Sequence, residues 1–389
     1  MKIIFVMGAD IRTGRGTENV LLNLVKYRPR DAEIIIIEND YLPEIRMSLQ
    51  DFETISRTST ILKIKHIEVY DNVLLRIFNN LIARRPLKLL KDIDPKIKDA
   101  IQSSDVLYFF FNMYSIIGDN LNIPVIASSH TSEARSIFLA DLDNPIVKVY
   151  KNLMYKTYYK NITGFHSFFN DVAVPELKHN MVLPNGVDTK LFYPNYKTSN
   201  EKLKVVFVAA LKPEKGLDIL LPLIDKFKRN SSIEFHIAGA GPLESKVKKT
   251  QNIIFHKSPD NSELAEIYRS SDVFIYPSHS DTFAMVVLEA LSSGLYVLAG
   301  SFFKGKFDDF EHKYLDYIPM NVKSFYHTLN RIIENRNLID HDKLLEYEYV
   351  KSNYSWPVIS DRFYDYMRKF SGNKILKNMD SRSDNSRID

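Results

Sequence analysis

The side chains of this sequence that could carry chemistry gather in short loops after apolar runs, and one of these loops is basic. Lys212 and Lys215 follow the run Leu203–Ala210 and precede an amphipathic stretch that begins near Gly216. Backbone amides at the start of a helix, together with a lysine, form a site for an anion such as a phosphate. A solvated loop between a strand and a helix, where lysines are common, is the alternative interpretation.

A second loop and the helix expected after it contain two acids eight residues apart. Asp281 lies in the polar stretch Ser278–Thr282, and Glu289 lies within the apolar run Met285–Leu291. Burying a carboxylate is costly unless it has hydrogen-bond partners, so Glu289 is expected to face a cleft or to be paired. The two hydroxyls of a ribose would be suitable partners, and a salt bridge on the helix surface is the alternative.

A third loop of the second half is rich in glycine. Gly239 and Gly241 follow the apolar run Ile233–Ala238. Glycine at such a position lets the backbone come close to a ligand or to a neighbouring strand. A tight turn between strand and helix explains the same two residues equally well.

The glycine loop near the N-terminus raises a different question. Gly14-Arg15-Gly16 follows an apolar run, as in the dinucleotide fingerprint G-x-G-x-x-G, but Asn19 stands where the third glycine belongs. No acid sits cleanly at the end of the next strand to bind a ribose, although Glu38 is close. These residues alone leave open whether the loop holds a dinucleotide or another ligand.

The elements that must position these loops alternate between strand and helix. Strands are predicted at Lys2–Gly8, Glu33–Glu38, Ile61–Val69, Asp105–Phe111, Pro124–Ser128, Leu203–Ala210, Ile233–Ala238, Ile253–His256, Val273–Tyr276 and Leu295–Ala299. Helical patterns lie between them, for example at Gly216–Lys228, Ser262–Ser270 and Ala284–Ser293. Nearly all-apolar strands in such an alternation predict an α/β fold with parallel sheets covered on both faces. The pattern restarts near residue 203, so we expect two Rossmann-like domains facing a central cleft, where ligands bind at the carboxyl ends of the strands.

Composition agrees with a globular protein and excludes several classes of site. A chain of 389 residues is long enough for two cores. Because cysteine is absent, a disulfide framework, a thiol nucleophile and a cysteine-ligated metal are excluded. The net charge of +4 is too small to indicate nucleic acid as a partner. Without a secretion signal or a long apolar stretch, a cytoplasmic location is expected.

Five motifs of the second half resemble one family, the glycosyltransferase group 1 (family 4). They are LPNGVDTKLFYP (183–194), ALKPEKG (210–216), AGAGPL (238–243), LAEIYRSSDVFIYPS (264–278) and LEALSSGLYVLA (288–299), in the family's order and spacing. The resemblance implies a retaining enzyme of the two-domain GT-B type that uses a nucleotide-sugar donor. The segment 355–370 resembles the helix with which this family usually ends, a helix that crosses back to the N-terminal domain.

The resemblance also implies domains. Residues 1–182, joined by the helix 355–370, would form the acceptor domain, and 183–354 the donor domain. Residues 371–389 are polar and are expected to be a disordered tail.

Matched residue by residue, the resemblance assigns roles to the loops. Lys215 corresponds to the lysine that contacts the donor diphosphate, and Asp281 and Glu289 to the two acids of the E-x7-E motif, of which the second holds the ribose. Gly16 and Glu18 correspond to the N-terminal GG-x-E loop, which makes that loop the lip of the cleft and not a dinucleotide loop. The histidine that faces the donor sugar corresponds to His130, for which a structural role at a strand end is the alternative.

We therefore expect catalytic roles for His130, Lys215 and Asp281. Donor contacts are expected from Gly16, Lys212, Lys215, Gly241, Asp281, Thr282, Phe283, Ala284, Met285 and Glu289. Acceptor-side contacts are expected from Glu18 and Arg15.

The sequence departs from the family at several of these places. Ala210 stands where an arginine normally shares the diphosphate charge, and Lys212 would replace it without the bidentate fork of arginine. The first acid of the E-x7-E motif is Asp281, the glycine after the phenylalanine is Ala284, and the GG-x-x-E segment after the last strand is missing. These departures leave open a relative that binds a sugar nucleotide without catalysis; an epimerase of the same two-domain shape is a further alternative.

The chemistry that these residues would perform needs no resident metal or cofactor. Breaking a sugar–phosphate bond places negative charge on the leaving diphosphate, which preorganised amides and lysines stabilise. Two Asp-x-Asp pairs, at 92–94 and 141–143, lie in or beside helical patterns and are interpreted as surface residues. We expect the acceptor to attack the same face of the sugar, with the leaving phosphate taking its proton.

A basic amphipathic segment indicates where an acceptor could be found. Residues 76–91 contain Arg76, Arg84, Arg85, Lys88 and Lys91 and no acid. Such a segment can lie on anionic lipid, which fits a glycan or lipid-linked oligosaccharide as acceptor. A solvated helix over the sheet is the alternative, and Pro86 would interrupt any single long helix.

Overall fold

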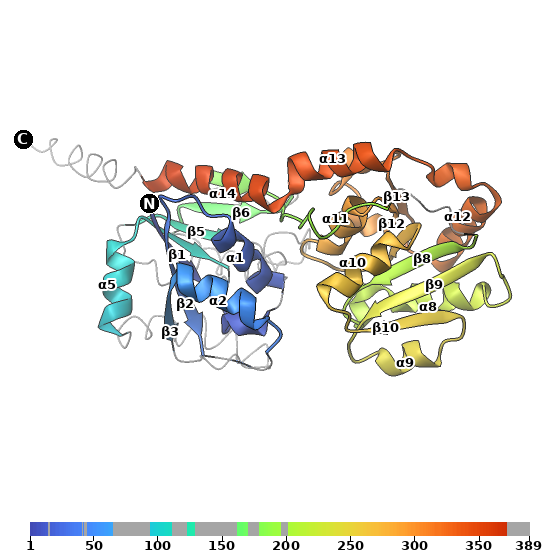
Figure 1. The fold of residues 1–389 in the computed structure, drawn as a ribbon, viewed down its shortest axis with the longest axis horizontal. Coiled ribbons are helices and arrows are strands. Elements are labelled where there is room, and N and C mark those ends of the chain that lie inside the picture. Colours follow the sequence, from blue (N-terminus) through green and yellow to red (C-terminus); the bar gives the residue numbers. More distant parts are fainter. Residues whose placement is uncertain are drawn as a thin grey trace, which may run out of the picture. The chain divides into compact units, whose positions relative to one another are not determined.

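The computed structural model describes residues 1–14, 16–40, 42, 45–64, 94–110, 123–128, 162–169, 179–195 and 201–371. The chain forms two compact units, which comprise Met1–Asn185 with Ile359–Asp389, and Gly186–Val358. Figure 1 shows a parallel sheet with covering helices in each. The division expected from the sequence set the boundaries after residues 182 and 354. The expected tail lies outside the described residues apart from Ser371.

Within its described residues, the first unit holds a seven-stranded sheet in the order β3-β2-β1-β4-β5-β6-β7. Every strand pair is parallel, and Ile3 of β1, for example, lies between Ile34 of β2 and Val106 of β4. The order reverses between β1 and β4, which makes that point the topological switch of this sheet. The strands are β1 (Lys2–Val6), β2 (Glu33–Asn39), β3 (Thr60–Ile64), β4 (Val106–Phe109), β5 (Val125–Ser128), β6 (Gly164–Ser167) and β7 (His179–Val182).

The described helices of this unit include two that begin at polar caps. Ser48 accepts the amide of Asp51 at the start of α2, and Asp94 accepts that of Lys96 at the start of α5, where proline fills the first position. Asp94 is thus a helix cap, and the other three acids of the two Asp-x-Asp pairs lie outside the described residues. The helices are η1 (Ile11–Thr13, a 3-10 turn), α1 (Gly16–Lys26), α2 (Leu49–Thr58) and α5 (Pro95–Ser103).

The C-terminal helix α14 (Trp356–Ser371) packs on the first unit from Ile359 onward. The Tyr364 hydroxyl donates to the Leu24 carbonyl at 2.8 Å, and the Ser360 hydroxyl donates to the Tyr27 carbonyl at 3.1 Å. Phe363 packs edge-on against Tyr108 in the core, with ring centroids 5.1 Å apart. This helix, drawn in red along the unit in Figure 1, therefore completes the hydrophobic core of a domain that begins more than 300 residues earlier.

The second unit, which is described except for residues 196–200, repeats the architecture with a six-stranded sheet in the order β10-β9-β8-β11-β12-β13. Its strands are β8 (Leu203–Val208), β9 (Ile233–Gly239), β10 (Ile253–Lys257), β11 (Val273–Tyr276), β12 (Tyr296–Gly300) and β13 (Leu315–Ile318). The covering helices are α8 (Leu217–Lys226), α9 (Glu244–Lys249), α10 (Asn261–Arg269), α11 (Met285–Ser292), α12 (Val322–Glu334) and α13 (Lys343–Tyr354). Its described 3-10 turns are η5 (Pro213–Lys215), η6 (Ser301–Phe303), η7 (Asp308–Phe310) and η8 (Arg336–Ile339).

Each of the ten strands predicted from the sequence overlaps a strand of the structure, whereas β6, β7 and β13 were not predicted. The strand expected at 61–69 appears as β3 as far as Ile64, and the residues after it lie outside the described part. Among the described helices, none is both long enough and apolar enough to span a lipid bilayer.

Candidate active site

The predicted donor residues of the second unit lie around its topological switch point, whereas Gly16 belongs to the first unit. There β8 lies between β9 and β11, so the connections that leave the carboxyl ends of β8 and β11 start side by side. In open α/β sheets, ligands bind outside the carboxyl ends of the strands at this point. Lys212 and Lys215 lie in the first of these connections, and Asp281 lies in the second.

Backbone contacts join these two loops into one surface. The His279 amide donates to the Glu214 carbonyl at 2.9 Å, and the Ser278 hydroxyl donates to the same carbonyl at 3.1 Å. Gly216 has a φ of +80°, and a Cβ placed there would lie 1.9 Å from the Pro277 carbonyl oxygen. Glycine is therefore required at the start of α8, both for the left-handed backbone and for the close approach.

Lys215 and Asp281 form an ion pair on this surface. Lys215 Nζ lies 2.7 Å from Asp281 Oδ2 and 3.2 Å from the Ser280 carbonyl. The Tyr276 hydroxyl donates to the same carboxylate oxygen at 2.6 Å. Both side chains of the pair keep some exposure, 17% for Lys215 and 16% for Asp281, so an anion from solvent can reach the ammonium group without first unfolding the loop.

Glu289 occupies a different environment, on the helix α11 that follows the second loop. Its Oε2 accepts a hydrogen bond of 3.3 Å from the Tyr268 hydroxyl of α10. Burial raises the pKa of Glu289 to about 7, and the Tyr268 hydrogen bond only partly opposes that shift. A carboxylate has about four acceptor positions, so Glu289 retains capacity for further hydroxyl donors.

The helices that begin around the switch point have uncapped N-termini. Among the described residues, no side chain caps α8, α9 or α11, whereas Asp260, Asn321 and Asp342 cap α10, α12 and α13. Uncapped amides at a helix start carry partial positive charge and bind anions. At the start of α11, Phe283 and Ala284 are buried while Thr282 and Met285 are partly exposed, and the Met285 amide donates to the Phe283 carbonyl at 2.9 Å.

The glycines at the end of β9 and just after it allow close packing of the loops. Gly239 and Gly241 have φ of +145° and +155°, and a Cβ at Gly241 would lie 2.7 Å from the Leu211 carbonyl oxygen. The Leu211 amide donates to the Ala240 carbonyl at 2.8 Å. These contacts match the interpretation that glycine allows a close approach to a neighbouring segment. Lys212 is exposed beside this contact, in the N-cap position of η5.

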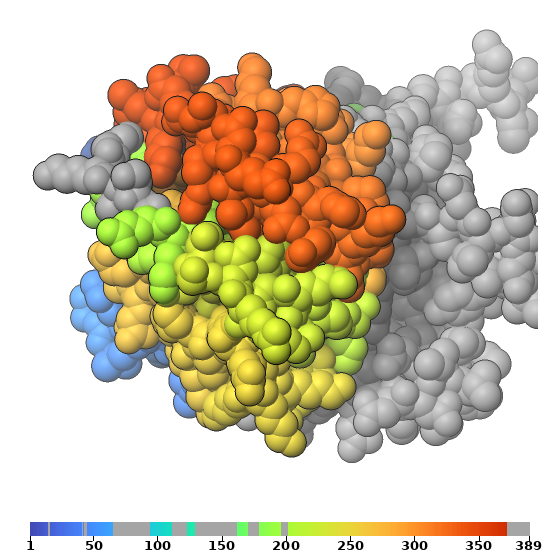
Figure 2. All heavy atoms as spheres, turned by 90° about the vertical axis from the view of Figure 1, so that its right-hand side faces the viewer, coloured from blue at the N-terminus to red at the C-terminus, as the bar shows by residue number. Residues whose placement is uncertain are grey.

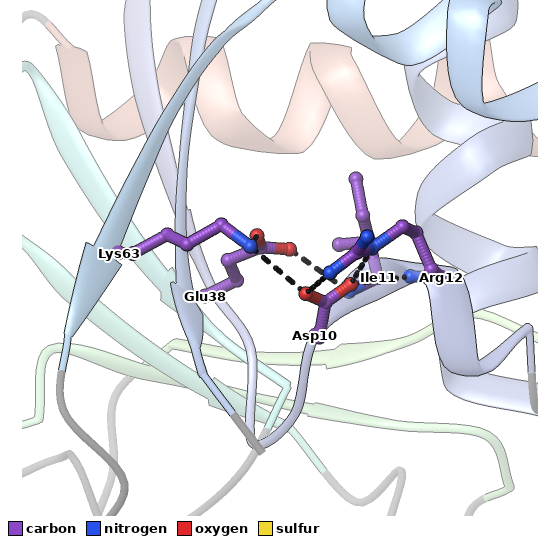
Figure 3. A network of polar contacts seen from close by, with 5 residues as sticks. All are labelled: Asp10, Ile11, Arg12, Glu38 and Lys63. Atoms are coloured by element: carbon purple, nitrogen blue, oxygen red, sulfur yellow. Dashed lines mark hydrogen bonds and ion pairs between the residues drawn. The ribbon is translucent and has the colours of Figure 1, made fainter. Parts of the chain in front are cut away.

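The contacts of Glu38 bear on whether the N-terminal loop binds a dinucleotide. Glu38, at the end of β2, is 1% exposed; its Oε2 accepts the Ile11 amide at 2.9 Å and its Oε1 lies 2.9 Å from Lys63 Nζ. Figure 3 shows this carboxylate beside donors of the chain itself. The acid that would bind a ribose in a dinucleotide site is therefore used inside the protein. Gly16 begins α1, where a Cβ would meet no described atom within 4 Å, and Glu18 is buried in the first turn of that helix.

Several predicted residues cannot be placed in this site. His130, Arg15, the segment 76–91 and the acids at 92 and 141–143 lie outside the described residues. In the described part of the chain, no group of three or more His, Asp or Glu side chains is arranged to hold a metal ion.

Three features of the two units had no role assigned from the sequence. Tyr268 and Tyr276, which hold the two acids, lie in the motif 264–278 but were not assigned a role. Their spacing was visible, since one stands on the helix and the other at the end of the next strand. The third group, the acid cluster around Lys63, depends on strand order and has no local signal.

A surface hollow of about 360 Å³ lies elsewhere on the second unit. Its lining residues stand at the amino ends of β8, β9 and β10, the edge opposite to the donor residues; they include Lys202, Lys228, Arg229, Ile233 and Asn252. Figure 2 shows the side of the unit where yellow-green and yellow residues of these strands and their connections reach the surface. This hollow contains none of the predicted site residues, and position in the sheet is the better guide to the site.

Comparison with known proteins finds a family match within the second unit. Residues 190–349 match the family model described as Glycosyl transferases group 1. A segment of 127 residues, 29% of this chain, is 35% identical to the sulfoquinovosyl transferase SQD2 of Arabidopsis thaliana and covers 24% of that protein. A longer match, of 217 residues and 47% of each chain, is 26% identical to the D-inositol 3-phosphate glycosyltransferase of Segniliparus rotundus. The chain thus spans less than half the length of these curated relatives.

Solved structures share the fold over nearly the whole chain. Sucrose-phosphate synthase from Thermosynechococcus elongatus matches with a TM-score of 0.71 at 14% identity, covering 95% of this chain and 99% of that one. Anabaena Alr3699/HepE in complex with UDP and glucose matches with a TM-score of 0.65 at 14% identity, covering 95% and 100%. At this identity the match establishes the shared two-domain fold.

Proposed function

We propose that this chain transfers a hexose-type sugar from a nucleoside-diphosphate sugar to a glycan or lipid-linked acceptor. The match of residues 190–349 to the group 1 glycosyltransferase model and the GT-B fold of the two units support this proposal. We further propose that the configuration of the sugar is retained and that no metal ion is required. The observation that carries the proposal is the switch point of the second unit, where Lys215, Asp281 and Glu289 meet uncapped helix starts.

The charges at this point suit a nucleoside diphosphate. The Lys215 ammonium and the amides at the start of α11 offer positive charge to the diphosphate, while Glu289 offers acceptors to the ribose hydroxyls. Such groups are fixed before the reaction begins and stabilise negative charge as it develops on the leaving diphosphate. In the HepE complex, UDP and glucose bind a protein of the same fold, which supports this class of donor.

The Lys215–Asp281 pair suggests how the site is kept ready. In the free protein Asp281 holds the ammonium group at the loop surface, and Tyr276 holds Asp281. A diphosphate would share the lysine with Asp281, and the carboxylate would then remain available to a sugar hydroxyl. The phosphate oxygen released as the sugar–phosphate bond breaks would accept the proton of the attacking hydroxyl, so no protein base is needed for the balance of the step.

The acceptor is proposed from the N-terminal half of the chain. The basic segment 76–91, by its composition, would suit the anionic surface on which a lipid-linked acceptor lies, and His130 is proposed to contact the donor sugar.

A panel of UDP-, GDP- and ADP-sugars tests the proposal. We expect the sugars of one nucleotide (UDP, GDP or ADP) to raise the melting temperature of the protein. When an acceptor extract of glycans and polyprenyl-linked sugars is added, the same sugars should release their nucleoside diphosphate. Lys215→Met should diminish both effects strongly, whereas Lys323→Met, which replaces an exposed lysine on α12, should change neither. The matched control separates loss of the diphosphate contact from loss of one positive charge.

Other outcomes of the same panel support the alternatives. A thermal shift without release of nucleotide, under every acceptor condition, would indicate a binding protein without transferase activity. Interconversion of one nucleotide sugar into another would indicate an epimerase. Release that requires a divalent cation, abolished by a chelator and restored by the cation alone, would contradict the proposed independence from metal.

A further inference from the structure

We propose that Lys63 is a positioning residue, which braces the loop between β1 and α1 so that the start of α1 can receive a substrate anion. The proposal rests on the proposed function for the identity of the substrate, and on the described contacts of the first unit for the bracing itself. Nothing in the pattern of the sequence indicates this role, because Lys63 lies 53 residues after the acid that it holds.

The contacts form a closed network across three adjacent strands (Figure 3). Lys63, near the end of the edge strand β3, places Nζ 2.9 Å from Glu38 Oε1 on β2 and 2.9 Å from Asp10 Oδ2 after β1. The other oxygen of Glu38 accepts the Ile11 amide at 2.9 Å. The Lys63 ammonium group therefore fixes the Asp10 side chain at the beginning of the loop. It also fixes the Glu38 carboxylate, which accepts the amide of the next loop residue, Ile11.

Arg12 completes the network from within the loop. Its Nη2 lies 2.7 Å from Asp10 Oδ2, and its Nε donates to Asp10 Oδ1 at 2.9 Å. Burial alone would raise the pKa of Asp10, but the hydrogen bonds from Arg12 and Lys63 lower it to about 2. Two carboxylates and two cations thus balance, and Asp10 is held in its ionised form.

The burial of the two acids makes Lys63 indispensable to this balance. The Asp10 and Glu38 side chains are 1% and 2% exposed, whereas that of Lys63 is 51% exposed. The two nearly buried carboxylates now share the ammonium group of Lys63. Without Lys63, Arg12 would be the remaining cation of the network. Because buried like charges repel strongly, the loop would have to move or an acid would have to take up a proton.

The loop leads directly into the helix start that is expected to face the substrate. Gly14 ends the 3-10 turn η1 in a left-handed conformation, and α1 begins two residues later at Gly16. The first amides of α1 attract anions, and an uncompensated carboxylate behind them would oppose that attraction. Lys63 therefore serves the site in two ways, by fixing the path of the loop and by cancelling negative charge behind it.

The test compares Lys63→Met with two matched variants. Lys63→Arg keeps a cation that can reach both carboxylates, and Lys257→Met removes a similarly exposed lysine from β10, the edge strand of the other sheet, where it pairs with Glu244 at 3.2 Å. Hydrogen exchange of the Ile11 amide is measured on all three full-length proteins. We expect exchange at least about tenfold faster in Lys63→Met, a rate near that of the wild type in Lys63→Arg, and no change in Lys257→Met.

A second readout links the network to substrate. With the donor identified by the nucleotide-sugar panel, Lys63→Met should raise the KM for that donor or its acceptor severalfold more than it lowers kcat, and Lys63→Arg should restore it. An unchanged Ile11 exchange rate in Lys63→Met would overturn the bracing role. The bracing role would also be overturned if hydrogen exchange of the Ile126 amide in β5 accelerated as much as that of Ile11, because the substitution would then destabilise the whole unit.

The two proposals fail in different ways. Should the wild type transfer no sugar from any donor, the proposed function fails and the link to substrate fails with it, while the exchange rates still decide whether Lys63 braces the loop. Should transfer proceed normally in Lys63→Met, the inference fails and the proposed function stands.

Discussion

Replacing Glu289 by glutamine is expected to make the protein more stable at alkaline pH and less able to bind a nucleotide. Burial raises the pKa of Glu289 from 4.5 to about 7. Between these two values the unfolded chain loses the proton and the folded chain keeps it, so the free energy of unfolding falls as pH rises. At about 1.4 kcal/mol per pH unit, the loss reaches about 3 kcal/mol above pH 7.

Glutamine has nearly the same shape and carries no charge to bury. Glu289→Gln should therefore raise the free energy of unfolding by up to about 3 kcal/mol at about pH 8, and by less than about 1 kcal/mol at about pH 5. Urea denaturation at the two pH values measures both. Glu266→Gln on the neighbouring helix is the control, because that side chain is 73% exposed and paired with Arg269; it should bring no gain at either pH.

Nucleotide binding should respond in the opposite direction. A ribose donates hydroxyl hydrogens to the ionised form of Glu289, so UDP or GDP must displace a proton from the carboxyl group below about pH 7. Affinity should then rise with pH from about 6 to 8, by up to about tenfold per unit at the low end. Titration calorimetry in two buffers of different ionisation enthalpy counts the released proton.

Two results would refute this account of Glu289. One is an unfolding free energy of Glu289→Gln that equals that of the wild type at about pH 8, which would mean that the carboxyl group is not penalised by burial. The other is nucleotide affinity in Glu289→Gln that is undiminished and equally dependent on pH, which would place the ribose elsewhere.

Three further predictions follow from described contacts. Lys215→Met should weaken UDP or GDP binding at least about tenfold in calorimetry, and adding Asp281→Asn should recover stability but not affinity, since the diphosphate contact is still missing. Burial lowers the pKa of His166 to about 4, so stability should fall as pH drops from about 6.5 to 4, and urea denaturation should show a shallower fall in His166→Gln. Gly216→Ala should lower stability by about 3 kcal/mol or more by thermal denaturation, against about 1 kcal/mol for Gly305→Ala, because the added Cβ meets a carbonyl oxygen at 1.9 Å at the first position and no described atom within 4 Å at the second.

Local sequence was enough to predict the elements whose side chains are uniform. The runs of isoleucine and valine in β2 and β8 form strands buried on both faces, and nearly continuous apolar strands have few other solutions. The loops after β8 and β11 were recognised for the same reason, since polar residues interrupt apolar runs there. Their adjacency in space follows from strand order, which the alternation of strands and helices predicts only in outline.

The missed strands lack that uniformity. β6 has the sequence GFHS and β7 the sequence HNMV, and both contain polar side chains. His166 of β6 accepts a hydrogen bond from the Tyr108 hydroxyl at 2.6 Å and donates to the Leu183 carbonyl at 2.8 Å. No local sequence pattern indicates such hydrogen-bond partners. A buried strand with polar side chains is therefore predicted as a loop.

The candidate site shows the same limit. The types of Lys215, Asp281 and Glu289 and their place in loops and helix were available from sequence, as was the family that they resemble. The phenols that hold the two acids are set by the packing of α10 against α11 and by the end of β11. Geometry of that kind comes from tertiary contacts, which a linear pattern does not record.

The two switch points of the chain differ in how far their charged side chains are exposed to solvent. At the second unit, one lysine and one aspartate meet at a partly exposed surface, and the described starts of α8, α9 and α11 around them have no side-chain cap. At the first unit, Asp10 and Glu38 are buried and are compensated inside the fold. A dianionic diphosphate gains most where cationic groups are exposed and preorganised, which favours the second unit. In the first unit, Lys63 and Arg12 balance the two buried carboxylates, so that the amides at the start of α1 can attract the proposed substrate anion without an uncompensated acid behind them.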